Sequence, residues 1–183
     1  MGNISGKRRE NRVQILGALF IIIGGLGVGY GYVEKERNRI AFVEKWECIM
    51  YLFLSEITYK KQPLCLACQE IGEKTGGEEG IFLKHIGERM EERKGKGFCS
   101  IWQEECVRYF QREKMPKEEQ LLLQEFGMLT GFEDENMQKK MIEEQARKWK
   151  KIRWQKQEEY QERKRLAMIL SSCVGIMMVL ILW

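Results

Sequence analysis

The sequence predicts an all-α protein, a bundle of about six helices held between two membrane-spanning helices. Apolar residues recur at helical spacing through the middle of the chain. Only 2 of the 183 residues are proline, which is too few for a loop-rich or β-rich fold. Each end of the chain also carries a long run without a charged residue, as membrane spans do.

The two uncharged runs divide the chain into four predicted segments. Residues 13–33 form a run of 21 without a charged side chain, and residues 166–183 form a run of 18. Both fall within the roughly 17–25 residues that a helix needs to cross a bilayer. We expect a basic tail at 1–12, a helical domain at 34–165, and a span on each side of that domain. A signal peptide explains the first run less well, because no small-residue cleavage site follows it.

The charge distribution indicates the orientation of the chain and its class of partner. Of the net charge of +4, the tail holds +3, from four basic residues against Glu10. The other 27 basic and 26 acidic residues leave only +1, so the middle domain is balanced. More basic residues flank the spans on the domain side (35, 37, 39, 45, 151, 153, 156, 163, 164 and 165) than in the tail. We therefore expect the domain to face the cytoplasm, in a multi-pass protein of the cell membrane.

Glycines in the first predicted span form two overlapping pairs, Gly25 with Gly29 and Gly27 with Gly31. This spacing lets two helix backbones approach closely in lipid. The partner would be the second span or another copy of the chain, which would make a homo-oligomer. Glycine is also common in transmembrane helices in general, and this explanation competes with specific packing.

Apolar positions three and four residues apart predict the helices of the middle domain. Glycines at 72, 76, 77 and 80 are expected to form a loop between the second and third helices. Asp134 suits the N-cap of the last helix. No helix breaker follows it, so this helix could continue through the second span for about 75 Å. The positions expected to face the core are Val43, Trp46, Met50, Phe53, Ile57, Leu64, Ala67, Cys68, Ile71, Phe82, Ile86, Met90, Phe98, Trp102, Cys106, Tyr109, Leu122, Leu123, Phe126, Met137, Met141, Ile142, Ala146, Trp149 and Ile152.

Candidates for chemistry are few. Cys65 and Cys68 form a C-x-x-C pair that could bind zinc with other ligands or act as a redox pair. Zinc sites usually have a second such pair, so one packed helix face is the competing interpretation. His85, the single histidine, is expected at the surface, and the glutamates on solvated helix faces. We therefore expect no enzyme activity, no cofactor and no small-molecule substrate.

A basic and aromatic run between Arg147 and Arg165 has two interpretations. It could follow a nucleic-acid strand, or it could meet lipid headgroups, because it approaches the second predicted span. Glutamates at 158, 159 and 162 would oppose a nucleic acid. We expect membrane lipid as a partner and no nucleic acid.

Two groups of residues match a known family. Phe126, Gly127, Gly131, Asp134 and Gln138 have the spacing of an F-G-x-x-L-G-x-x-D-x-x-x-Q signature, with threonine in the leucine position. Upstream, the segment from Glu56 to Leu64, which includes Pro63, matches an E-I-x-Y…P-L pattern. With these motifs and its span–domain–span order, the chain resembles the stage III sporulation protein AB family of endospore-forming bacteria.

The resemblance implies a membrane component of the machinery in the mother-cell membrane around the engulfed forespore. The family is similar to platform proteins of type II secretion and type IV pilus systems, whose cytoplasmic helical domains engage an assembly ATPase. By that analogy the chain would couple an ATPase to a channel complex formed with other stage III sporulation proteins. Its signature residues would be partner-binding or structural, with Gly131 and Asp134 as helix caps and Gly127 in close packing. The alternative is a membrane-anchored thiol or metal-binding protein that uses Cys65 and Cys68.

Overall fold

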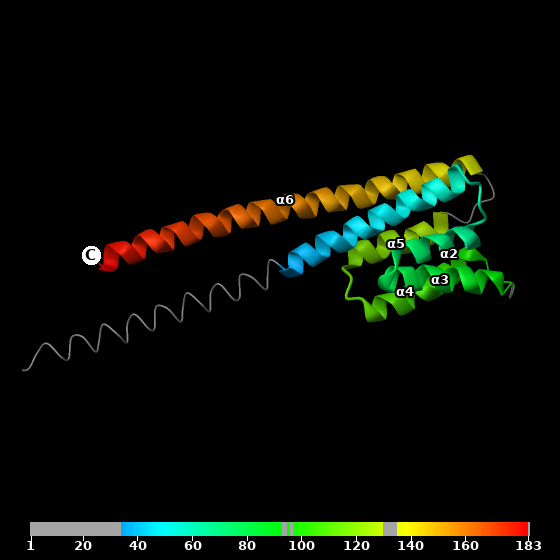
Figure 1. Ribbon diagram of the computed structural model, residues 1–183, viewed down its shortest axis with the longest axis horizontal. Coiled ribbons are helices and arrows are strands. Elements are labelled where there is room, and N and C mark those ends of the chain that lie inside the picture. Colours follow the sequence, from blue (N-terminus) through cyan, green and yellow to red (C-terminus); the bar gives the residue numbers. More distant parts are fainter. Residues whose placement is uncertain (1–33, 93–94, 96, 130–134, 183) are drawn as a thin grey trace, which may run out of the picture. The chain divides into compact units, whose positions relative to one another are not determined.

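The computed structural model describes residues 34–92, 95, 97–129 and 135–182 (Figure 1). The chain divides into two compact units, Met1–Ala41 and Phe42–Trp183. Residues 34–41, the described part of the first unit, are helical. The second unit holds helix 42–58 and the helices α2 (Leu64–Thr75), α3 (Gly77–Glu91), α4 (Phe98–Arg112), α5 (Lys117–Leu129) and α6 (Glu135–Leu182). The all-α prediction is confirmed for the described residues, which contain no strand.

The core of the second unit is built around Trp102 of α4, whose side chain is fully buried. Its ring centroid lies 4.8 Å from that of Phe126 and 5.1 Å from that of Phe82. The ring centroids of Phe98 and Phe53 lie 5.3 and 6.4 Å from that of Trp102. Offset and edge-on aromatic pairs at these separations add stabilisation to simple burial. Trp102 therefore joins helix 42–58, α3 and α5 to α4.

A second aromatic group surrounds Trp46 of helix 42–58. Its indole stacks on Trp149 of α6 with centroids 5.9 Å apart and an interplanar angle of 22°. Phe82 and Tyr109 meet Trp46 edge-on, at 5.8 and 5.9 Å. In Figure 1 the first third of α6 runs alongside helix 42–58, and the two tryptophans lie in this contact.

Most of the predicted core positions are buried. Met137 is an error of the sequence analysis, because its side chain is 41% exposed on α6. Leu64, Met90 and Met141 are half-buried at the edge of the core. The helical spacing therefore identified the inward face of each helix, and it failed mainly at the first turn of α6.

The predicted glycine loop between residues 72 and 80 is also wrong. α2 and α3 are separated by Gly76 alone, and the chain turns there through positive φ angles at Gly76 (61°) and Gly77 (66°). Gly72 and Gly80 are helical. A Cβ on Gly72 would lie 2.8 Å from the carbonyl oxygen of Gly80, and a Cβ on Gly80 would lie 2.6 Å from that of Gly72. These two glycines allow α2 and α3 to cross in backbone contact.

α6 is a single helix of 48 residues, so the expected continuity into the second apolar run is confirmed. Among the α6 side chains whose burial the structure describes, the last buried one is Ile152, and residues 161–170 are all exposed. No helix among the described residues has the length and hydropathy needed to cross a bilayer. The first predicted span lies outside the described residues. The two-span arrangement and the boundaries at 12, 33 and 165 therefore stay predictions.

Candidate functional site

The signature pair Phe126-Gly127 lies on the face of α5 that meets α4. A Cβ at position 127 would lie 2.5 Å from Cγ of Trp102 and 2.9 Å from its Cβ, so only glycine leaves room for this indole. Trp102 Nε1 donates a hydrogen bond of 2.7 Å to the carbonyl oxygen of Leu123, one turn before Gly127. Phe126 is buried against the same ring. This part of the signature holds α4 and α5 together.

The upstream signature residue Glu56 is a buried carboxylate at the end of helix 42–58, only 2% exposed. Its two carboxylate oxygens form ion pairs with lysine Nζ atoms: Oε1 with Lys74 of α2 at 2.7 Å, and Oε2 with Lys60 at 2.8 Å. Burial alone would raise the pKa of Glu56. The hydrogen bonds and charges of the two lysines outweigh burial, and the pKa is lowered from its ordinary value of 4.5. Glu56 therefore stays ionised and links helix 42–58 to α2.

Of the remaining signature residues, the structure describes Pro63 and Gln138, which lie on different elements. Pro63 is exposed and precedes α2, where its carbonyl oxygen accepts a hydrogen bond from the backbone N–H of Ala67. Gln138 is half-buried on α6. Gly131 and Asp134 lie outside the described residues, as do the glycines at 25, 27, 29 and 31. Their roles as caps, partner contacts or span packing stay predictions.

Ion pairs also fasten α6 to the rest of the bundle, through carboxylates on other helices. Lys156 reaches Glu119 of α5 at 2.9 Å, and the Glu119 side chain is only 1% exposed. Lys148 reaches Glu125 of α5 at 2.6 Å. Burial alone would raise the pKa of Glu125, but hydrogen bonds from Lys148 and Gln145 and the charge of Lys148 lower it. A third ion pair joins α6 to helix 42–58, between Arg153 and Glu47.

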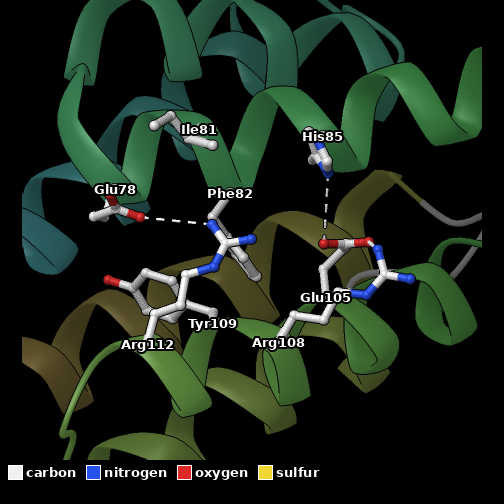
Figure 2. Close-up of a pocket in the computed structure, with 8 residues that line it drawn as sticks. All are labelled: Glu78, Ile81, Phe82, His85, Glu105, Arg108, Tyr109 and Arg112. Carbon is white, nitrogen blue, oxygen red and sulfur yellow. Dashed lines mark hydrogen bonds and ion pairs between the residues drawn. The ribbon is translucent and has the colours of Figure 1, made fainter.

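A shallow pocket between α3 and α4 is bridged by charged side chains (Figure 2). Arg112 of α4 lies 3.7 Å from Glu78 of α3, and His85 of α3 lies 3.8 Å from Glu105 of α4. The space between them has a volume of about 10 Å³, which is enough for roughly one water molecule. This pocket is too small to enclose a metabolite.

The family model of stage III sporulation protein AB (spore_III_AB) matches residues 14–183. The chain belongs to this family. The resemblance inferred from the two motifs is therefore confirmed, and it gives the chain a role in sporulation.

The fold of this chain is similar to that of a solved structure. It is a "Stage III sporulation protein AB (SpoIIIAB)", similar to this chain with a TM-score of 0.61 and 16% sequence identity. The match covers 67% of this chain and 96% of that one. At this identity the likeness concerns the fold alone. A search of the curated proteins gave no match.

Cys65 and Cys68 have the positions expected of residues that pack in the core. Cys68 is fully buried in the core face of α2, and Cys65 is half-buried one turn before it. Burial raises the pKa of the Cys68 thiol, which disfavours the reactive thiolate. Within the part of the chain that the structure describes, no three His, Cys, Asp or Glu side chains are arranged to hold a metal. The thiol or metal alternative receives no support from these positions.

The buried carboxylates are a feature that local sequence patterns did not reveal. Glutamates were assigned to solvated faces, yet five of them are buried: Glu47, Glu56, Glu79, Glu105 and Glu119. A signal was present in the spacing, because Glu56 follows Phe53 by three residues and Glu105 follows Trp102 by three. A carboxylate at a core position needs a cation in reach, and each of these five has at least one on another helix. The identity of these cations could not be deduced from one helix at a time.

Proposed function

We propose that this protein is a non-enzymatic membrane component of the sporulation machinery, located in the mother-cell membrane around the forespore. Its middle domain faces the cytoplasm and binds an assembly ATPase. The chain thereby couples this ATPase to a channel complex built from other stage III sporulation proteins. The chain supplies mechanical connection and a binding surface, and the ATPase supplies the chemical energy. The analogy with secretion and pilus platform proteins is one of fold and arrangement, and it sets the hypothesis to be tested.

The observation that carries this proposal is the continuity of α6. Its first part is held by Trp149 in the aromatic core and by the ion pairs of Arg153 and Lys156. The same helix continues to Leu182 without a break. A helix fixed in the bundle at one end transmits a displacement or rotation of the bundle to the other end. If residues 166–182 enter the bilayer, movement of the domain is coupled to the membrane.

The non-enzymatic part of the proposal is supported by the chemistry of the described side chains. The pocket in Figure 2 admits about one water molecule. Its lining carboxylate Glu105 is already engaged by Arg89 at 2.7 Å and Arg108 at 3.0 Å. Both guanidinium groups contact the same oxygen, Oε1, so this carboxylate is held in a structural ion-pair cluster. Its role is to join α3 to α4.

A pair of insertions in α6 tests the mechanical coupling. Seven residues are inserted between Gln161 and Glu162, which are both exposed and lie beyond Lys156 and its ion pair to the bundle. One insert is alanine-rich and helical, and the matched insert is composed of glycine and serine. Seven residues add almost two helical turns, so the helical insert changes the facing of the two ends by only about 20°.

The insertions are introduced into the full chain and tested in a deletion strain for heat-resistant spores. We expect the wild-type chain and the helical insert to restore spores, and the flexible insert to fail although it accumulates to the same level. Co-purification of the stage III assembly ATPase should survive in both insertion variants, because the binding surface is untouched. Equal spore counts from the two inserts would contradict mechanical coupling.

A further inference from the structure

Seven of the basic residues of α6 fall into two sets that differ in their partners. Those that face the bundle, Lys148, Arg153 and Lys156, all form ion pairs with carboxylates of neighbouring helices. A second set faces away from the bundle. It consists of Lys140, Arg147, Lys150 and Lys151.

We call these four cations, together with Trp154, the outer stripe. Successive members are seven, three, one and three residues apart, a spacing that keeps them on one broad face of the helix. This face lies opposite the side that buries Ile142, Trp149 and Ile152. From the first member to the last, the stripe extends about 21 Å along the axis.

All five residues of the outer stripe are available for binding. The four cations are exposed, and the Trp154 side chain is 57% exposed. Among the residues that the structure describes, none of the four cations has an ion pair or a hydrogen bond. Unpaired cations beside an exposed tryptophan match the composition of protein-binding hot spots, which are enriched in arginine and tryptophan.

The pattern of charge along this face favours a protein over a uniform polyanion. Exposed glutamates share the face: Glu144 lies between Lys140 and Arg147, and Glu158 follows Trp154. A nucleic acid would bring phosphates against these carboxylates as well as against the cations. A protein surface can place acidic residues opposite the cations and leave neutral or basic ones opposite the glutamates.

Position along the helix argues against lipid headgroups as the occupant. Leu166 begins the apolar run, and Trp154 precedes it by 12 residues, which corresponds to about 18 Å of helix. Lys140 is 26 residues away, or about 39 Å. Charge interactions at physiological ionic strength are screened over about 8 Å. In a helix that continues into the bilayer, most of the outer stripe stands beyond the reach of the headgroups.

We propose that the outer stripe is a docking site for an acidic surface of a partner protein. The partner's carboxylates pair with Lys140, Arg147, Lys150 and Lys151, and an apolar side chain of the partner covers Trp154. This inference deepens the proposed function and rests on it, because it assigns one binding surface to the assembly role. The side of α6 that faces the bundle is occupied, so the outer face is where this helix can accept a partner without unfolding.

Site-specific photocrosslinking in sporulating cells tests the docking site. The full chain carries p-benzoylphenylalanine in place of Arg147 or Lys151, and in place of Lys117 as the control. Lys117 is an exposed cation on α5, and no ion pair forms there among the described residues. We expect a discrete protein adduct from the two stripe positions and none from the control, with the crosslinked peptide of the partner rich in Asp or Glu.

Charge reversal then tests whether the cations of the outer stripe hold the partner that is crosslinked. The variant K140E/K150E, combined with the crosslinker at Arg147, should lower the adduct yield by roughly tenfold. Changing the acidic residues of the crosslinked peptide to lysine should restore it. Because all these side chains are exposed, the circular dichroism of the variant should match that of the unchanged chain. The neutral variant K140Q/K150Q serves as a second measure if the reversal disturbs folding.

Three results would overturn the docking site: adducts to lipid or nucleic acid only, equal adducts at position 117, or a yield unaffected by either double variant. Spore counts separate this failure from failure of the proposed function. If the docking site alone is wrong, the helical and flexible insertions in α6 still differ in spore yield. If the two insertions behave alike, mechanical coupling is wrong whatever the crosslinks show.

Discussion

Gly127 illustrates how a single missing methyl group can position two helices. The indole of Trp102 occupies the space where a side chain would begin, and its N–H reaches the carbonyl oxygen of Leu123 at 2.7 Å. Helix propensity alone would favour alanine over glycine by about 1 kcal/mol. The packing of Trp102 opposes that preference. Its indole lies against the backbone of α5, so a side chain at position 127 could be accommodated only if α4 moved.

Replacement of Gly127 with alanine is therefore expected to destabilise the chain. We expect a loss of about 1–3 kcal/mol in the free energy of unfolding, as for other overpacked sites. Urea denaturation of the full chain in detergent, followed by tryptophan fluorescence, measures it. Gly97 is the control, because a Cβ there meets no atom within 4 Å. If Gly127→Ala were as stable as wild type, the tight contact with Trp102 would not limit the packing.

Glu56 allows a prediction about pH. Its pKa is lowered in the folded state, so the folded chain holds the ionised carboxylate more strongly than the unfolded chain does. The stability that this shift contributes is present above pH 4.5 and is lost as the pH falls through the lower folded pKa. Glu56→Gln removes the carboxylate and leaves Lys60 and Lys74 without this acceptor.

We expect Glu56→Gln to cost about 1–3 kcal/mol near neutral pH. The difference from wild type should shrink as the pH falls below 4.5, because protonation removes the same charge from the wild-type chain. Urea denaturation at pH 7 and at acidic pH measures both values. Glu70→Gln is the matched control, since Glu70 pairs with Lys60 at 3.0 Å from a more exposed position. A constant difference across this range would contradict the assignment of Glu56 as ionised.

Among the helices, α6 depends on a small number of contacts for its attachment. Lys156 forms one of the ion pairs to the bundle, and its partner Glu119 is almost fully buried. Removal of the cation leaves a buried carboxylate without compensation. This is more costly than the loss of an exposed pair, because the desolvation of the carboxylate remains.

Lys156→Gln should therefore destabilise the chain by about 3 kcal/mol, whereas the double variant Glu119→Gln/Lys156→Gln should recover part of this loss. Thermal denaturation of the full chain gives the four values of a double-mutant cycle. Lys150→Gln is the control, because Lys150 lies on the same helix and is exposed. If the double variant were no more stable than the single variant, the burial of Glu119 would not be the source of the cost.

The sequence predicted the helices because each of them carries its own apolar spacing. Val43, Trp46, Met50 and Phe53 on one helix define a buried face that local periodicity reveals. Contacts between helices carry no such local signal. Glycine favours loops in general, yet Gly72 and Gly80 are helical because the backbones of α2 and α3 meet there. For the same reason, Glu119 was assigned to the solvent, since its cation lies 37 residues further along the chain.

For the chain as a whole, the proposed function depends on attachment to a membrane. The uncharged runs at 13–33 and 166–183 are the residues proposed to provide it. Full-length protein should remain in the membrane pellet after extraction with alkaline carbonate. Removal of both runs should release residues 34–165 into the supernatant as a folded helical domain, and removal of one should leave the protein bound. Release of the full chain would contradict the two-span proposal.

The orientation of the domain follows from the same arrangement and can be tested separately. Basic residues on the domain side of both runs favour a cytoplasmic domain. When the chain is expressed in vegetative cells, so that it lies in the outer cell membrane, protease added outside intact protoplasts should therefore leave residues 34–165 uncut, and the same protease should cut them after detergent lysis. An extracytoplasmic domain would be cut in intact protoplasts and could not reach an ATPase that uses cytoplasmic ATP. That result would leave membership of the family standing, but it would remove the ATPase from the list of direct partners.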